Sequence, residues 1–78
     1  YDIRVNVIAP GIVNAGLAKA EAERNPEYAE RITRTVPLGR LQTPEDVAHG
    51  AAFLLSDQAR NVTGTTLLID GGASLGMP

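Results

Sequence analysis

Few side chains in this 78-residue sequence have the chemistry of a catalytic centre. It contains a single histidine, His49, and no cysteine. A correctly placed histidine can act as a general base. Because His49 falls in the middle of a predicted helix, we interpret it instead as a surface or interface residue.

The charged residues do not form an obvious ligand set. The acidic residues are scattered, and Asp70-Gly71-Gly72 lacks the following ligands of a calcium loop, so we predict no metal site. Arg40 could bind a substrate anion. A surface ion pair between Arg40 and Glu45 or Asp46 is the simpler interpretation.

Composition excludes several classes of protein. Seven Lys and Arg against nine Asp and Glu give a formal net charge of −2, which excludes an electrostatic nucleic-acid binder. No apolar run approaches the ~20 residues that span a bilayer. The absence of cysteine excludes a disulfide scaffold. We therefore expect no nucleic-acid partner and no membrane partner.

The best candidate for a binding site is the turn at Pro10-Gly11. Residues 2–9 are rich in β-branched side chains and end at this turn, which predicts a strand that stops there. In open parallel sheets, ligands bind at the carboxyl ends of the strands. Gly11 would let the backbone approach a ligand closely. On its own, a strand ending in Pro-Gly is better explained as a plain turn.

The other elements follow from local signals. Residues 12–37 are predicted to form a lid, with a helix over residues 17–24 and a second helix that Asn25 caps and that runs to about Arg34. Residues 43–56 are predicted to form a helix capped by Thr43. Residues 65–69 are predicted to form the last strand. A strand, a long connection with a helix, and another strand are typical of a parallel crossover, so we predict the C-terminal part of a doubly wound α/β domain.

The helix over residues 43–56 has two predicted faces. Its core-facing stripe has six apolar members: Val47, Ala48, Ala51, Ala52, Leu54 and Leu55. Phe53 and His49 fall outside this stripe, and Gly50 is expected to lie beside them. A phenylalanine off the core stripe indicates that another surface packs there.

The length fits part of a larger protein. With one Phe and two Tyr in 78 residues, a self-sufficient core would be marginal. The sequence begins with Tyr1 rather than Met. We therefore expect residues 1–78 to be a fragment of one domain.

Four motifs in order resemble the short-chain dehydrogenase/reductase family. Residues 3–11, Ile-Arg-Val-Asn-Val-Ile-Ala-Pro-Gly, resemble its sixth strand and the turn that follows. Residues 37–48, from Pro-Leu-Gly-Arg to Thr-Pro-Glu-Asp-Val-Ala, resemble its next segment. Residues 62–64 and 69–72 resemble its last strand and close. Only the predicted lid, about residues 17–36, is unspecific.

The resemblance implies a Rossmann-like domain and an NAD(P)-dependent oxidoreductase. In that family the turn that matches Pro10 and Gly11 lies against the nicotinamide. Backbone groups at the position of Val13 bind its carboxamide, with Ile12 adjacent. The family usually has Thr at the position of Ala15, so that hydroxyl contact is lost here, and Asn14 is a candidate to replace it. The predicted cofactor-binding residues are therefore Pro10, Gly11, Ile12, Val13 and Asn14, for either NAD or NADP.

The catalytic residues of the family are absent from this sequence. Four places after Tyr1 is Val5 and four places after Tyr28 is Ile32, so neither tyrosine belongs to the family's Tyr-x-x-x-Lys motif. We expect the catalytic Ser, Tyr and Lys to lie upstream and the isolated chain to be inactive. The lid would close over a small carbonyl or alcohol substrate, with Leu17, Tyr28 and Ile32 as its apolar lining. A 3-oxoacyl thioester reductase and a polyol or sugar dehydrogenase are both compatible.

A non-catalytic role is the alternative. In tetrameric members of the family, the segments that match residues 43–56 and 65–69 pack against a second subunit. The chain could therefore act as an oligomerisation or interaction segment, and we expect the parent protein to be a homo-oligomer, a homotetramer, in the cytoplasm.

Overall fold

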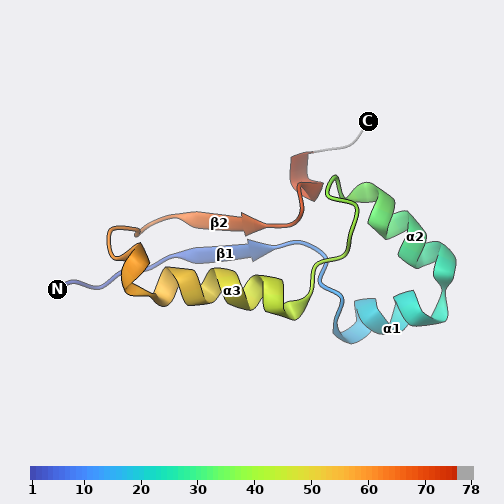
Figure 1. The fold of residues 1–78 in the computed structure, drawn as a ribbon, viewed down its shortest axis with the longest axis horizontal. Coiled ribbons are helices and arrows are strands. Elements are labelled where there is room, and N and C mark those ends of the chain that lie inside the picture. Colours follow the sequence, from blue (N-terminus) through green and yellow to red (C-terminus); the bar gives the residue numbers. More distant parts are fainter. Residues whose placement is uncertain (76–78) are drawn as a thin grey trace.

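The computed structural model describes residues 1–75 (Figure 1). Its helices and strands follow the order β1 (Val7–Pro10), α1 (Gly16–Arg24), α2 (Pro26–Thr35), α3 (Pro44–Leu55) and β2 (Thr66–Ile69). Two short 3-10 turns, Asp57–Ala59 and Ala73–Leu75, flank β2.

The two strands lie side by side and run in the same direction. Val7 pairs with Thr66 at one end of the ladder, and Pro10 pairs with Ile69 at the other. The connection between them contains α1, α2 and α3, and α3 packs against both strands along one face of the sheet (Figure 1). A parallel pair needs such a crossover because its strands cannot be joined by a tight turn. The predicted α/β class, with a parallel crossover, is confirmed.

The first strand is shorter than predicted. We expected it to cover residues 2–9, but regular pairing begins at Val7 and extends through Pro10. The Val5 amide donates instead to Thr63 Oγ1 over 3.1 Å, and the Gly64 amide donates to the Val5 carbonyl over 2.8 Å. Gly64 has φ +72°, a left-handed conformation that does not continue a β ladder. The strand therefore begins where the partner backbone becomes extended.

The predicted helix starts are confirmed. The Asn25 side chain accepts hydrogen bonds from the amides of Glu27 and Tyr28, and Pro26 takes the first position of α2. Thr43 caps α3 in a reciprocal pair: its hydroxyl accepts from the Asp46 amide, and the Asp46 carboxylate accepts from the Thr43 amide. Each arrangement satisfies amide groups that a helix start leaves without partners.

The face of α3 that meets the sheet differs from the predicted stripe. Leu54 is buried and Val47 and Ala51 are half-buried, but Leu55 is 83% exposed. Gly50, which we placed beside the outer face, lies against β2: a Cβ atom there would be 2.4 Å from Ile69 Cδ1. The prediction for Gly50 was wrong because the side chains of β2 fill the space that its missing side chain leaves.

No helix within residues 1–75 covers the face of the sheet opposite α3. The molecule measures 50 × 27 × 15 Å, so it is elongated and thin. Its accessible surface is 5871 Å², against roughly 4,500 Å² for a compact monomer of this mass. Ile3, Val5, Val7 and Leu68 are exposed apolar residues of the strand segments. None of the helices within residues 1–75 is long and apolar enough to cross a membrane.

Candidate functional site

The turn after β1 is held against the end of β2. The Gly11 amide donates to the Ile69 carbonyl over 2.9 Å, which extends the ladder by one hydrogen bond. A Cβ atom on Gly11 would lie 2.7 Å from Asp70 Cβ and 3.0 Å from Asp70 Cα, closer than carbon atoms normally approach. Glycine is therefore required here by sterics, because it allows the two strand ends to meet.

The next residues cross to the segment before α3. Val13 forms an isolated parallel bridge with Gln42, and the Asn14 amide donates to the Gln42 carbonyl over 2.8 Å. Within residues 1–75 the backbone amides of Ile12 and Val13 have no hydrogen-bond partner. Two adjacent free donors therefore follow the carboxyl end of a parallel strand, which is where ligands bind in such sheets.

Helix α1 begins after Ala15 without a side-chain cap. Ala15 is the N-cap of α1, and it has no side chain that could accept a hydrogen bond from the first turn. Threonine is a good N-cap residue, and alanine is a poor one. Asn14 is half-buried beside it, and its side chain makes no hydrogen bond to another residue among 1–75.

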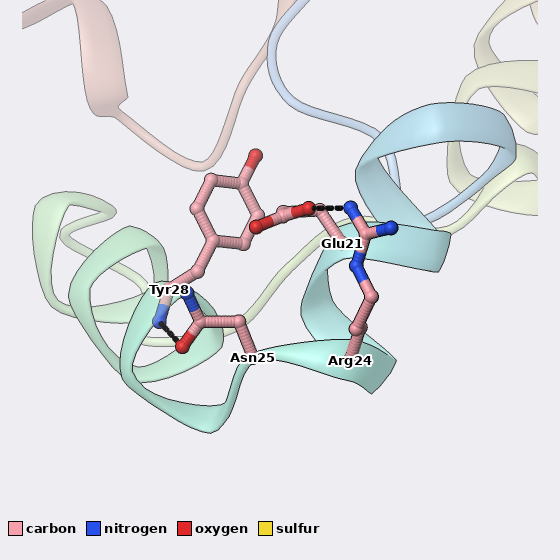
Figure 2. Close-up of polar contacts among 4 residues, drawn as sticks. All are labelled: Glu21, Arg24, Asn25 and Tyr28. Atoms are coloured by element: carbon pink, nitrogen blue, oxygen red, sulfur yellow. Dashed lines mark hydrogen bonds and ion pairs between the residues drawn. The ribbon is translucent and has the colours of Figure 1, made fainter.

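The predicted lid is a hairpin of α1 and α2 that projects beyond the carboxyl ends of the strands (Figure 1). The two helices pack mainly on each other. At their junction, Glu21 and Arg24 form an ion pair on α1, and the Asn25 side chain accepts from the Tyr28 amide (Figure 2). The Arg24 guanidinium lowers the pKa of the Glu21 carboxyl through this hydrogen-bonded contact.

The three predicted lid-lining residues do not share one surface. Tyr28 and Ile32 lie one turn apart on α2 and are half-buried, whereas Leu17 is 91% exposed. The Arg31 guanidinium lies over the Tyr28 ring at 5.7 Å from its centroid. The structure thus brings Tyr28 and Ile32 together and leaves Leu17 outside.

A cavity of about 310 Å³ lies between the turn that follows β1, the first turns of α3 and the end of β2. Ile12 is the one predicted cofactor-binding residue that lines it. The other lining residues are Val36, Leu38, Arg40, Gln42, Asp46, His49, Ile69, Asp70 and Gly71. Leu17, Tyr28 and Ile32 do not contribute, so this cavity is separate from the predicted lid lining.

Three titratable side chains that line this cavity, those of Arg40, Asp46 and His49, are exposed. His49 is exposed on α3. Arg40 makes no ion pair within residues 1–75, so the surface pair that we expected with Glu45 or Asp46 is absent there. The hydrogen bond from the Thr43 backbone is the main cause of the lowered pKa of Asp46, and the nearby Arg40 charge contributes. Residues 1–75 contain no group of three side chains that could hold a metal ion.

Asp70 organises the turn that follows β2. Its carboxylate oxygens accept from the amides of Gly72 and Ser74, each over 2.9 Å. These backbone donors, with Ser74 first, hold the pKa of the Asp70 carboxyl below its ordinary value. The same turn touches Gly11 on one side and Val36 on the other. In the sequence, the two consecutive glycines at positions 71 and 72 are the one signal of this close packing.

Comparison with known proteins matches nearly the full length of the chain to one protein family. Residues 1–74 match the protein family described as enoyl-(acyl carrier protein) reductase. The chain is 52% identical to 3beta-hydroxysteroid dehydrogenase 1 of Eggerthella lenta over 94% of its length. It is 47% identical to L-rhamnose 1-dehydrogenase (NAD(P)(+)) of Azotobacter vinelandii over 92% of its length. It spans 28% of each of these two relatives.

Solved structures of similar proteins superpose on nearly the full length of this chain. An oxidoreductase of Burkholderia thailandensis, described as a member of the short chain dehydrogenase/reductase family, superposes with a TM-score of 0.83 at 41% identity, over 94% of this chain and 28% of that one. A 4-hydroxyisoleucine dehydrogenase complexed with NADH gives 0.84 at 35% identity, over 96% and 30%. A putative 2-deoxy-d-gluconate 3-dehydrogenase from Agrobacterium tumefaciens with bound NADP gives 0.81 at 35% identity, over 95% and 30%.

Proposed function

The chain belongs to the short-chain dehydrogenase/reductase family, and we propose that it forms the C-terminal part of an NAD(P)-dependent oxidoreductase. The parent enzyme would transfer hydride between a nicotinamide cofactor and a small carbonyl or alcohol substrate. The bound cofactor supplies the hydride chemistry, and the protein supplies binding and orientation.

The observation that carries this proposal is the pair of free amides after Gly11. The Val13 amide has no partner within residues 1–75, and it follows a turn whose glycine lets the end of β1 pack against Asp70 at the end of β2. A carboxamide oxygen is a suitable acceptor for such a donor. Residues 10–14 would therefore hold the nicotinamide ring in a fixed orientation, with Val13 as the main donor and Ile12 against the ring.

The lid would close over the substrate from the same edge of the sheet. The chain leaves the cofactor turn directly into α1, so the hairpin stands next to the proposed nicotinamide position. Tyr28 and Ile32 supply a half-buried apolar and aromatic surface on α2. This surface would exclude water from the transferred hydride. Leu17 would join it only if closure covers the first turn of α1.

We propose that the proton of the reaction comes from residues outside this chain. Neither tyrosine is followed four places later by lysine. We propose that the parent protein carries the family's Ser and Tyr-x-x-x-Lys upstream of Tyr1, and that residues 1–78 alone bind and position without catalysing. The large exposed apolar surface of the sheet supports this, since an enzyme core would cover it.

The test compares the full-length protein with the isolated chain. We expect the full-length protein to oxidise or reduce a carbonyl/alcohol pair with NAD(H) or NADP(H), and to lose this activity when the upstream tyrosine is replaced by Phe. The isolated chain should show no turnover. An upstream sequence without Tyr-x-x-x-Lys would contradict the catalytic proposal.

An oligomerisation role is the second candidate, and the exposed side chains of α3 favour it. Phe53 is 43% exposed and Leu55 is 83% exposed, on a helix that packs with its other face on the sheet. Strand β2 pairs only with β1 among residues 1–75, so its other edge is open. We propose that α3 and β2 join two subunits of the parent protein. Replacing Phe53 with Asp should then dissociate the oligomer in analytical ultracentrifugation, whereas the exposed control Glu45→Gln should not.

A further inference from the structure

The turn that follows β2 is packed against the point where the lid hairpin returns to the body of the protein. We name residues 70–72 the lid seat and residues 36–38 the lid exit. Val36 is only 7% exposed, although the helix that precedes it has no buried residue. The Leu38 amide donates to the Gly71 carbonyl over 3.1 Å, which joins the two segments directly.

Both glycines of the lid seat are in close contact with the lid exit. A Cβ atom on Gly71 would lie 2.6 Å from Val36 Cγ1, and a Cβ atom on Gly72 would lie 3.1 Å from Pro37 Cγ. Valine is stiff at χ1 and the proline ring is rigid, so neither side chain can swing far from an added methyl group. The absent side chains of the seat therefore determine how close the lid exit lies to β2.

Hydrogen bonds to the Asp70 side chain hold the lid seat in its conformation. The Asp70 carboxylate accepts from the amides of Gly72 and Ser74 over 2.9 Å each, which holds the turn in shape. On its other side, Asp70 lies against Gly11 of the proposed cofactor turn. One short turn thus touches both the segment proposed to hold the nicotinamide and the segment that carries the lid.

The hairpin has few other attachments. Helices α1 and α2 pack mainly on each other and project away from the sheet (Figure 1). Before α1, the chain is attached by the bond from the Asn14 amide to the Gln42 carbonyl, 2.8 Å long. After α2, it is attached at the lid exit. A shift of the exit would therefore move the hairpin relative to the cofactor turn.

We infer that Gly71 and Gly72 are positioning residues, which set the closed position of the lid relative to the bound cofactor and substrate. This inference rests on the proposed oxidoreductase function for its kinetic consequence, but the contact itself does not depend on it. The two glycines touch no reacting atom and act through Val36 and Pro37.

The test uses the full-length protein with Gly71→Ala and the matched control Gly64→Ala. Both glycines have a positive φ, +63° and +72°, so both variants carry the same kind of backbone strain. A Cβ atom on Gly64 meets nothing within 4 Å, whereas one on Gly71 meets Val36. We expect Gly71→Ala to lower kcat/KM about 10- to 100-fold, because a misplacement of about 1 Å at a positioning contact costs up to this much.

The loss should lie mainly in KM for the carbonyl or alcohol substrate. A variant that merely unfolds in part would lower kcat and leave KM unchanged, because the folded fraction still binds normally. Gly64→Ala should stay within about threefold of wild type, since its strain lies at the opposite end of β2. Equal kinetics for the two variants would overturn the inference.

A rescue variant and a proteolysis measurement complete the test. Val36→Ala removes the methyl groups that an alanine at position 71 would meet, so the double variant should recover toward Val36→Ala alone. Trypsin should cut faster after Lys19, Arg31 and Arg34 in Gly71→Ala than in Gly64→Ala, because all three side chains are exposed on the hairpin. A double variant no better than Gly71→Ala, or equal cleavage rates, would contradict the inference.

The two proposals fail separately. If the full-length protein transfers no hydride, the proposed function is wrong, and the cleavage rates still decide whether the seat positions the lid. If Gly71→Ala does not fold, Val36→Ala becomes the test variant, because it loosens the lid exit without creating a clash. It should then raise both KM and the rate of tryptic cleavage in the hairpin, and unchanged values would contradict the inference.

Discussion

Replacing Gly11 with alanine tests the proposed cofactor turn by sterics alone. Gly11 does not have a positive φ, so alanine is compatible with the local backbone conformation. The new Cβ atom would lie 2.7 Å from Asp70 Cβ and 3.0 Å from Asp70 Cα. Neither atom is at the end of a flexible side chain, so rotation of a side chain cannot relieve the contact. The ends of β1 and β2 must separate.

The size of this separation follows from the distances. The two Cβ atoms must move apart by about 0.7 Å to reach 3.4 Å, the lower limit of ordinary contact. Overpacking of this kind costs about 1–3 kcal/mol of unfolding free energy. A displacement of 0.7 Å also exceeds the ~0.5 Å range of good N–H···O distances. Loss of one such hydrogen bond, about 0.5–1.5 kcal/mol, raises the cofactor Kd roughly 2- to 10-fold.

The assay is a fluorescence titration of the full-length protein with NADH and NADPH, with a thermal melt beside it. Gly64→Ala is the control, because it adds a methyl group in open space at the far end of β2. It should cost about 1 kcal/mol of stability through its positive φ and leave Kd unchanged. Gly11→Ala should lower the melting temperature and weaken the cofactor. An unchanged melting temperature of Gly11→Ala would refute the steric reasoning. An unchanged cofactor Kd would refute the proposed cofactor turn.

Three further predictions concern the caps and turns. Thr43→Ala should lower the unfolding free energy by about 1 kcal/mol, measured in urea, since alanine lacks the hydroxyl that accepts from the Asp46 amide, while the backbone amide that donates to the Asp46 carboxylate remains; no change would contradict the cap. Asn25→Ala should lower the helicity and protease resistance of the hairpin, because α2 loses its N-cap acceptor, and unaltered tryptic cleavage after Arg24 would speak against this. The pKa of Asp70 is lowered by the amides of Ser74 and Gly72, so its contribution to stability is present above its ordinary pKa of 3.8 and is lost as the pH falls through the lowered value. Asp70→Asn should therefore flatten the acid limb of a melting-temperature profile, and an identical limb would contradict the assigned contacts.

Local chemistry explains what could be predicted from the sequence. Asn25 with Pro26, and Thr43 with Pro44, start helices through contacts within three residues, so their positions are readable from the sequence alone. The parallel relation of the strands likewise follows from the length of the connection and its helix.

The errors come from contacts between distant segments. Where β1 begins depends on Gly64, almost sixty residues away along the chain, whose φ interrupts the partner backbone. The face of α3 depends on Gly50, because a residue without a side chain carries no weight in an apolar pattern although Ile69 packs into its place. The seat of the lid depends on Val36 and Gly71, which no local pattern connects.

The most direct test of the account is a crystal structure of the full-length protein with its bound nicotinamide cofactor. The account predicts the nicotinamide carboxamide within about 2.7–3.2 Å of the Val13 backbone nitrogen, with Gly11 below the ring and the α1–α2 hairpin closed over it. A nicotinamide ring bound away from residues 10–14, with the Val13 amide paired to another protein group, would contradict it.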